Sequence, residues 1–339
     1  MFNIYKKMIL ISLFPTLAMA SWLKVEGTLN VDSFGSKNGD WKDTLRTASS
    51  SLAFEAAVRE GIRVVLVAEW GRIFRENGRK ASDEFDFEAF IKEAYISIEL
   101  DKLGRPRAII RSVTVGKHGM AFGQGVSEVP MTDDNLMDGI SKQEGVIGIT
   151  FEINPQLLRI VDQVAISVFE TAEDDLQISD NYGVSVKLGK KVTQQIELQV
   201  SGLYKQVLNE SGPGTLDELR SSVGLVWTSE DEKTKVYGEF IYLNNNQEYL
   251  ETDFAIQVGL SRQLGPGTVV FEYAYVQKYA QEMVAGYNLP VGKYLVISPE
   301  VRYQFARKYA DREHDDDLRI GVRTTLHFAA EAPRRVLKP

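Results

Sequence analysis

The sequence contains no cysteine, which excludes disulfide bonds and the lipid-modified cysteine of a lipoprotein. It contains three histidines, His118, His314 and His327, which are too few and too scattered to predict a metal site. Beyond the N-terminus there is no apolar run of about 20 residues, the length that a membrane-spanning helix needs. The chain is therefore not a helical membrane protein, and no cofactor is predicted.

The sequence also lacks an excess of positive charge. The 39 lysines and arginines are outnumbered by 47 aspartates and glutamates, for a formal net charge of −8. Nucleic acid is a poor partner for such a chain, because its phosphates attract basic surfaces. The hydrophobic fraction of 44% is close to the globular average, so composition alone does not identify a membrane protein.

The first 20 residues have the form of a secretory signal peptide. Lys6 and Lys7 precede a short apolar core from Met8 to Met19, and Ala18-Met19-Ala20 has the small-x-small form of a cleavage site. We therefore expect residues 1–20 to be removed and the mature chain to begin at Ser21. The alternative is a short buried N-terminal helix, which the brief apolar run disfavours.

From Ser21 onward, apolar residues recur with a period of two, which is typical of β-strands. Fifteen segments show this alternation: 23–31, 52–58, 62–70, 94–100, 107–115, 147–153, 164–168, 182–188, 196–204, 223–227, 236–242, 254–260, 269–275, 295–305 and 318–328. An even number is required if both chain ends lie on the same side of a membrane. We therefore place a sixteenth strand near 281–288, with a turn at 289–292.

The connections between these segments alternate between two lengths. Those at 59–61, 101–105, 189–191, 229–233 and 263–267 are short, whereas the others, such as the polar stretch 34–43, are longer. Outer-membrane barrels have this asymmetry, with short periplasmic turns and long external loops. Aromatic residues also recur at strand ends, as two interfacial girdles require: Trp22, Trp70, Tyr204, Trp227, Tyr242, Tyr303 and Phe328.

Alternation alone does not distinguish a soluble β-sandwich from a barrel in lipid, because each has one apolar face. Three features favour the membrane. The strands have about ten residues, as a tilted crossing needs. No helix is legible over roughly 300 residues, and the second face is rich in charge, glycine and serine. We predict an all-β fold, a transmembrane antiparallel β-barrel of about 16 strands over residues 21–328, with a periplasmic tail at 329–339.

One long stretch, Gly116 to Glu144, has no apolar period, and loops of this length usually have a function. We predict that residues 117–144 fold inward and narrow the lumen. Length and composition fit an outward loop equally well.

Three local segments resemble the Gram-negative general porins. Val113-Thr114-Val115-Gly116-Lys117, leading to Phe122-Gly123, is similar to the porin junction between a strand and the third loop, where an arginine usually stands in place of Lys117. An acidic stretch follows, and the last strand LRIGVRTTLHF ends in an aromatic residue. The chain departs from the family in the eleven residues after Phe328.

The resemblance implies a water-filled channel narrowed by loop carboxylates that face a basic wall. The acidic candidates are Glu128, Asp133, Asp134 and Asp138, and the basic candidates are Arg63, Arg107, Lys117, Lys187, Arg319 and Arg323. It also implies a homotrimer, a surface in contact with outer-membrane lipid and lipopolysaccharide, and insertion by the barrel-assembly machinery. The acidic excess favours a weak preference for cations. Each of these charges could instead be a solvated or locally paired group.

Other barrel functions remain open. An enzyme would need acidic or nucleophilic groups beside a histidine at the external rim, and His314 is the sole candidate there. Asp315, Asp316 and Asp317 lack the spacing of a calcium site. A plugged structural or adhesive barrel and a channel specific for sugar or phosphate are the remaining alternatives, so the main prediction is a porin without enzymatic activity.

Overall fold

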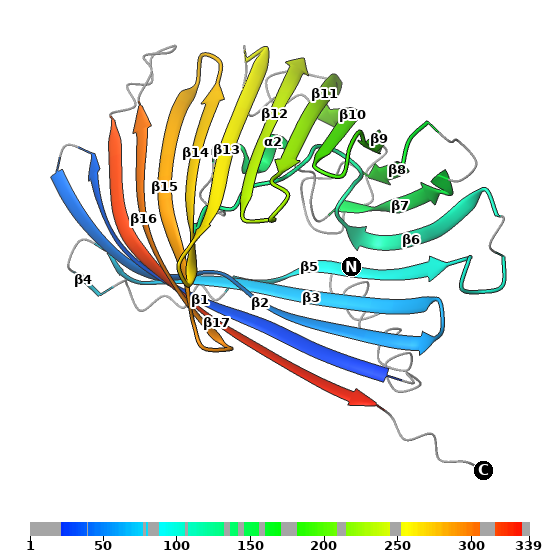
Figure 1. The fold of residues 1–339 in the computed structure, drawn as a ribbon, viewed down its shortest axis with the longest axis horizontal. Coiled ribbons are helices and arrows are strands. Elements are labelled where there is room, and N and C mark those ends of the chain that lie inside the picture. Colours follow the sequence, from blue (N-terminus) through cyan, green and yellow to red (C-terminus); the bar gives the residue numbers. More distant parts are fainter. Residues whose placement is uncertain are drawn as a thin grey trace.

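The computed structural model is a single closed β-barrel with a segment of chain inside it (Figure 1). The structure describes residues 22–38, 40–76, 79–80, 88–105, 108–131, 136–141, 146–155, 160–170, 182–208, 215–244, 252–305 and 316–333. The expected signal peptide, residues 1–20, lies outside the described residues. Within them, no helix is long and apolar enough to cross a membrane.

The barrel wall consists of antiparallel strands in chain order, closed by pairing of the last strand with the first. Its strands are β1 (Trp22–Asn38), β2 (Asp40–Arg59), β3 (Ile62–Glu76), β5 (Glu88–Glu99), β6 (Ile110–His118), β7 (Val146–Ile153), β8 (Gln163–Glu170), β9 (Tyr182–Lys191), β10 (Ile196–Leu208), β11 (Thr215–Thr228), β12 (Thr234–Asn244), β13 (Phe254–Leu264), β14 (Gly267–Val276), β15 (Ala280–Val291), β16 (Leu295–Phe305) and β17 (Asp317–Pro333). The two-residue β4 (Arg79–Lys80) extends from β3. The prediction of an all-β barrel with sixteen strands is confirmed.

The two faces of the wall are inverted relative to a water-soluble protein. Along β11, Glu218, Arg220 and Ser222 are 2–4% exposed, whereas Val223 and Leu225 on the alternate face are 53% and 41% exposed. In water, exposed apolar rows of this kind would forfeit the free energy of burial. The wall is therefore suited to lipid outside and a polar interior, which argues against the soluble sandwich.

Several boundaries differ from the sequence prediction. Within the polar stretch 34–43, residues 34–38 and 40–43 are strand rather than connection, because β1 continues to Asn38 and β2 begins at Asp40. Residues 189–191 belong to β9, and the turn follows them. The strand predicted at 281–288 exists and extends to Val291. Polar sequence does not end a strand when both of its neighbours continue the hydrogen-bond ladder.

The final strand also runs further than expected. It was predicted to end at Phe328, yet β17 continues to Pro333, and Ala329–Pro333 pair with Trp22–Glu26 of β1. Gly27 makes room for this, because a side chain there would collide with the Phe328 ring. The first five residues of the expected tail are thus part of the wall, and 334–339 lie outside the described residues.

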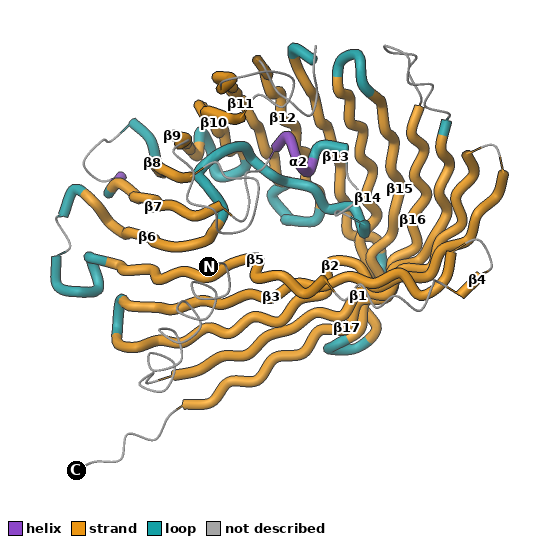
Figure 2. The backbone as a smooth tube through the Cα atoms, turned by 180° about the vertical axis from the view of Figure 1, so that it is seen from behind, coloured by secondary structure: helices purple, strands orange, loops and turns teal. Residues whose placement is uncertain are grey.

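After β6 the chain turns into the barrel. Residues 119–131 run along the inner surface, and the short helix α2 (Asp138–Ser141) lies on the same side (Figure 2). Gly116 at the root of this loop has a φ of +130°, and a Cβ there would lie 2.3 Å from the Ala94 carbonyl oxygen. A glycine is therefore required where the strand bends inward.

Candidate functional site

The inward loop is anchored to the wall by an apolar cluster inside the barrel. Met120, Phe122, Met137 and Ile140 of the loop are each at most 7% exposed. They pack with apolar wall residues on β8, β10, β12, β13 and β14, namely Phe169, Leu203, Ile241, Leu243, Ala255, Ala274 and Val276. A face rich in charge, glycine and serine predicts a wet lumen, whereas along these strands the inner face forms part of an apolar cluster.

Backbone N–H groups along the loop donate to side chains of the wall. Three of these N–H groups donate to hydroxyls: Ala121 to Ser167 at 3.0 Å, Gly123 to Ser201 at 2.9 Å and Glu128 to Tyr237 at 3.3 Å. Three others donate to carboxylates: Gln124 to Glu239 at 2.7 Å, Met131 to Glu300 at 2.9 Å and Leu136 to Glu282 at 3.3 Å. Loop N–H groups buried away from water need such partners. The wall therefore supplies the negative charge, and the loop supplies the donors.

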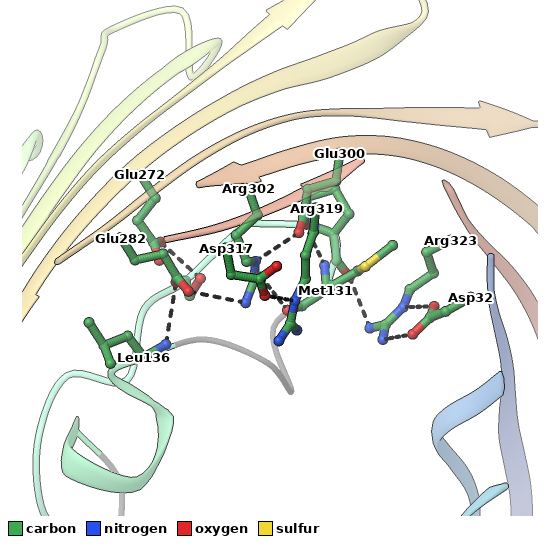
Figure 3. A network of polar contacts seen from close by, with 12 residues as sticks. Asp32, Met131, Leu136, Glu272, Glu282, Glu300, Arg302, Asp317, Arg319 and Arg323 are labelled. Atoms are coloured by element: carbon green, nitrogen blue, oxygen red, sulfur yellow. Dashed lines mark hydrogen bonds and ion pairs between the residues drawn. The ribbon is translucent and has the colours of Figure 1, made fainter. Parts of the chain in front are cut away.

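Three buried arginines bind the carbonyl groups of the same loop. Arg323 donates to Pro130 at 3.0 Å, Arg302 to Met131 at 2.7 Å and Arg220 to Ile140 at 3.2 Å. Figure 3 shows Arg302 and Arg323 on the two sides of Met131, with Arg302 directed toward Glu282 and Glu300 and Arg323 toward Asp32. The loop is thus held through both its N–H and its C=O groups.

Each of these arginines is also paired with an acid of the wall. Arg323 makes two bonds to Asp32, at 2.7 and 2.8 Å. Arg302 lies 3.1 Å from Glu300 and 3.6 Å from Glu282, and Arg220 contacts Glu218 on its own strand. Buried charges need this degree of pairing to offset their desolvation. We call the loop contacts of these arginines and carboxylates the clasp.

Gly123 allows the first part of the loop to pass close to Ser141, at the end of α2. Its φ is +62°, and a Cβ would lie 1.8 Å from the Ser141 carbonyl oxygen. No side chain fits between these two parts of the loop.

The opposite side of the interior is open. A hollow of about 630 Å³ lies against β3, β5, β6 and β7. It is lined by charged and hydroxyl side chains together with the first residues of the loop: Arg63, Glu93, Tyr95, Ser97, Glu99, Arg111, Ser112, Thr114, His118, Gly119, Thr150 and Glu152. Water and small solutes therefore meet a polar wall on this side and the loop on the other.

The predicted acidic residues are only partly described. Glu128 does lie in the inward loop, where its carboxylate pairs with Lys235 of β12 at 2.7 Å. Asp133 and Asp134 lie outside the described residues. Asp138 is the first residue of α2, and its side chain is likewise not described.

The predicted basic residues are scattered. Arg63 lines the hollow, where it lies 3.3 Å from Glu55 and 3.5 Å from Glu99. Lys187 is on the inner face of β9, Arg319 pairs with Asp317 at 2.8 Å, and Arg323 belongs to the clasp.

One member of the basic set does not fit, and another is not described. Lys117 alternates with the inward-facing Ser112, Thr114 and His118, which places it in the phase of Val115, a residue that is 43% exposed on the outer face. Arg107 lies outside the described residues.

Sequence reasoning missed most of the clasp. Arg220, Arg302, Glu218, Glu239, Glu282 and Glu300 received no role. Two of its pairs have a local signal, because Glu218 and Arg220, like Glu300 and Arg302, stand two residues apart on one face of a strand. Such a pair on an inward face indicates a neutralised cluster rather than a free charge.

No protein-family model and no curated protein sequence matches the chain. Solved structures do match over nearly its whole length. The outer-membrane channel DcaP of Acinetobacter baumannii aligns with a TM-score of 0.64 at 12% identity, over 90% of this chain and 97% of that one. OprB of Pseudomonas putida gives 0.62 at 12%, over 93% and 96%. The chain therefore has the fold of the outer-membrane porins.

A third match, the anion-selective porin of Comamonas acidovorans, has a TM-score of 0.61 at 11% identity, with 90% of this chain and 99% of that chain covered. The resemblance to porins seen in the sequence is thus matched by the three-dimensional fold. At these identities the likeness concerns architecture, and residue roles must come from the chain itself.

Proposed function

We propose that the protein is an outer-membrane porin that allows ions and small hydrophilic solutes to diffuse passively through a water-filled channel. The observation that carries this proposal is the combination of a closed wall, apolar outside, with a polar hollow left open beside the inward loop. A sixteen-stranded barrel is wide enough to leave an aqueous channel even when one segment lies inside it. The loop narrows that channel from the β8–β17 side.

The remaining features of the proposal follow from the porin fold and the sequence. Residues 1–20 direct export and are cleaved, the short turns face the periplasm, and the long loops face outward. The barrel-assembly machinery inserts the chain, which contacts lipid and lipopolysaccharide and assembles as a homotrimer. The channel weakly prefers cations, because acidic residues exceed basic ones.

The test is the conductance of purified, folded protein in a planar lipid bilayer. Stepwise increases in current are expected, and a reversal potential in a salt gradient measures ion preference. Folding is monitored independently by heat-modifiable migration in electrophoresis. Folded protein that gives no steps would exclude the channel.

The second candidate is a plugged structural barrel, and the apolar cluster favours it. Met137 and Ile140 are 1% and 0% exposed, so the loop blocks the part of the lumen that it covers. In the bilayer experiment this alternative predicts a folded, silent protein.

A further inference from the structure

The hollow beside the loop carries more negative than positive charge. Its lining includes the glutamates Glu93, Glu99 and Glu152 and the arginines Arg63 and Arg111. Arg63 also pairs with Glu55, and Arg111 with Asp101, two acids that are not part of the lining. Lys102 adds one positive charge beside Glu99, at 2.6 Å. These residues comprise five carboxylates and three cations.

Glu152 is the member of this group that is least neutralised. Its carboxylate accepts a hydrogen bond from the Ser112 hydroxyl at 2.9 Å. Within the part of the chain that the structure describes, no lysine or arginine pairs with it. It is half-buried on the inner face of β7, so its charge acts on the hollow and is less screened than that of a surface glutamate.

The clasp does not offer comparable charge to a passing ion. Glu239, Glu282 and Glu300 are each at most 4% exposed and are occupied by loop N–H groups. Glu128 is paired with Lys235. Of these inner-wall groups, the carboxylates that line the open hollow are Glu93 and Glu99 of β5 and Glu152 of β7.

We infer that Glu152 and the hollow around it set the cation preference of the channel. This rests on the proposed channel function and revises the expected role of the loop carboxylates. His118 and Gly119, at the root of the loop, line the same hollow, so an ion that passes the narrowed level of the lumen passes this wall. Hydroxyl oxygens of Ser97, Thr114 and Thr150 provide further ligands for a partly dehydrated cation.

The test compares the reversal potential of variants in a KCl gradient. Glu152→Gln keeps the size of the side chain and an oxygen for the Ser112 hydroxyl. It should lower the ratio of potassium to chloride permeability roughly twofold, the scale of one unit charge several ångströms away in water. Glu152→Lys should lower the ratio further, by roughly fourfold.

Three control variants separate the alternatives. Glu128→Gln and the double variant Asp133→Asn/Asp134→Asn remove loop carboxylates and should shift the ratio less than Glu152→Gln does, whereas Glu230→Gln in the exposed turn 229–233 should leave it unchanged. A shift in the loop variants, with none at Glu152, would overturn the inference. Failure of the channel proposal would look different, because the unmodified protein would then give no current steps.

Discussion

Asp32 and Arg323 face each other across the seam where the first strand meets the last, joined by hydrogen bonds of 2.7 and 2.8 Å. The same guanidinium donates to the Pro130 carbonyl at 3.0 Å. One side chain therefore bridges the seam of the barrel and holds the loop.

Replacing Arg323 with methionine should lower the free energy of unfolding by about 3 kcal/mol, because the fully buried Asp32 carboxylate loses its two-bond partner and keeps only Arg46, at 3.4 Å. Urea unfolding in lipid vesicles, followed by tryptophan fluorescence, measures this. The control is Arg319→Met on the same strand. Arg319 is 33% exposed and its partner Asp317 is 17% exposed, so this pair is expected to contribute less, about 1 kcal/mol. Equal losses in the two variants would contradict the role of the seam.

Arg302→Met should loosen the loop without opening the wall. It removes the donor to the Met131 carbonyl and leaves Glu300 and Glu282 without their cation. We expect larger fluctuations of the open-channel current at an unchanged strand content in circular dichroism. Arg111→Met, at a side chain that is 54% exposed and outside the clasp, should leave the current noise as it is.

Ile140→Ala should destabilise the folded barrel by about 2–5 kcal/mol, because the 0% exposed side chain leaves a cavity in the apolar cluster. Val258→Ala removes a comparable apolar side chain from the outer face, where 49% of it is exposed. Lipid fills that space, so a much smaller loss is expected. If the two variants unfold at the same urea concentration, the cluster is not a core.

Gly123→Ala and Gly265→Ala form a matched pair. Both glycines have a φ close to +60°, so the backbone strain of the substitution is similar. Only at Gly123 does a Cβ meet another atom, the Ser141 carbonyl oxygen. Gly123→Ala should therefore alter the single-channel conductance, whereas Gly265→Ala should affect stability alone. The same conductance in both variants would place the loop elsewhere.

Removing residues 329–339 deletes five register pairs between β17 and β1. We expect this truncation to lower the temperature at which the folded band is lost in heat-modification electrophoresis. Removing only 334–339 leaves those pairs intact and serves as the control. An unchanged temperature for the longer deletion would mean that Phe328 is the functional end of the barrel.

The barrel wall is predictable from the sequence because the alternation of apolar and polar residues within each strand reveals its two faces. Val223 and Leu225 alternate with Ser222 and Gly224, and no distant information is needed to see a strand there. The extensions at Asn38, Asp40 and Pro333 escaped notice because polar or small residues complete a ladder whose neighbours are far away in the chain.

Local sequence patterns do not predict the clasp, because its partners are far apart in the chain. The hydrogen bond between Gln124 and Glu239 spans 115 residues, and that between Arg323 and Pro130 spans 193. Alternation identifies Glu239 and Arg323 as inward-facing but does not reveal what they meet. The sequence signal for the loop is thus its lack of a period, and its partners appear only in three dimensions.

The apolar cluster within the barrel also constrains the order in which the chain can fold. The loop follows β6, yet it packs on strands up to β14 and is held by an arginine on β17, which closes the wall. A finished ring would have to admit Met137 and Ile140 through water-filled space with their apolar surfaces unpaired. The loop must instead pack against the growing sheet before the edges of the sheet meet. The pairing of β1 with β17 and the enclosure of the loop then occur together as the final step.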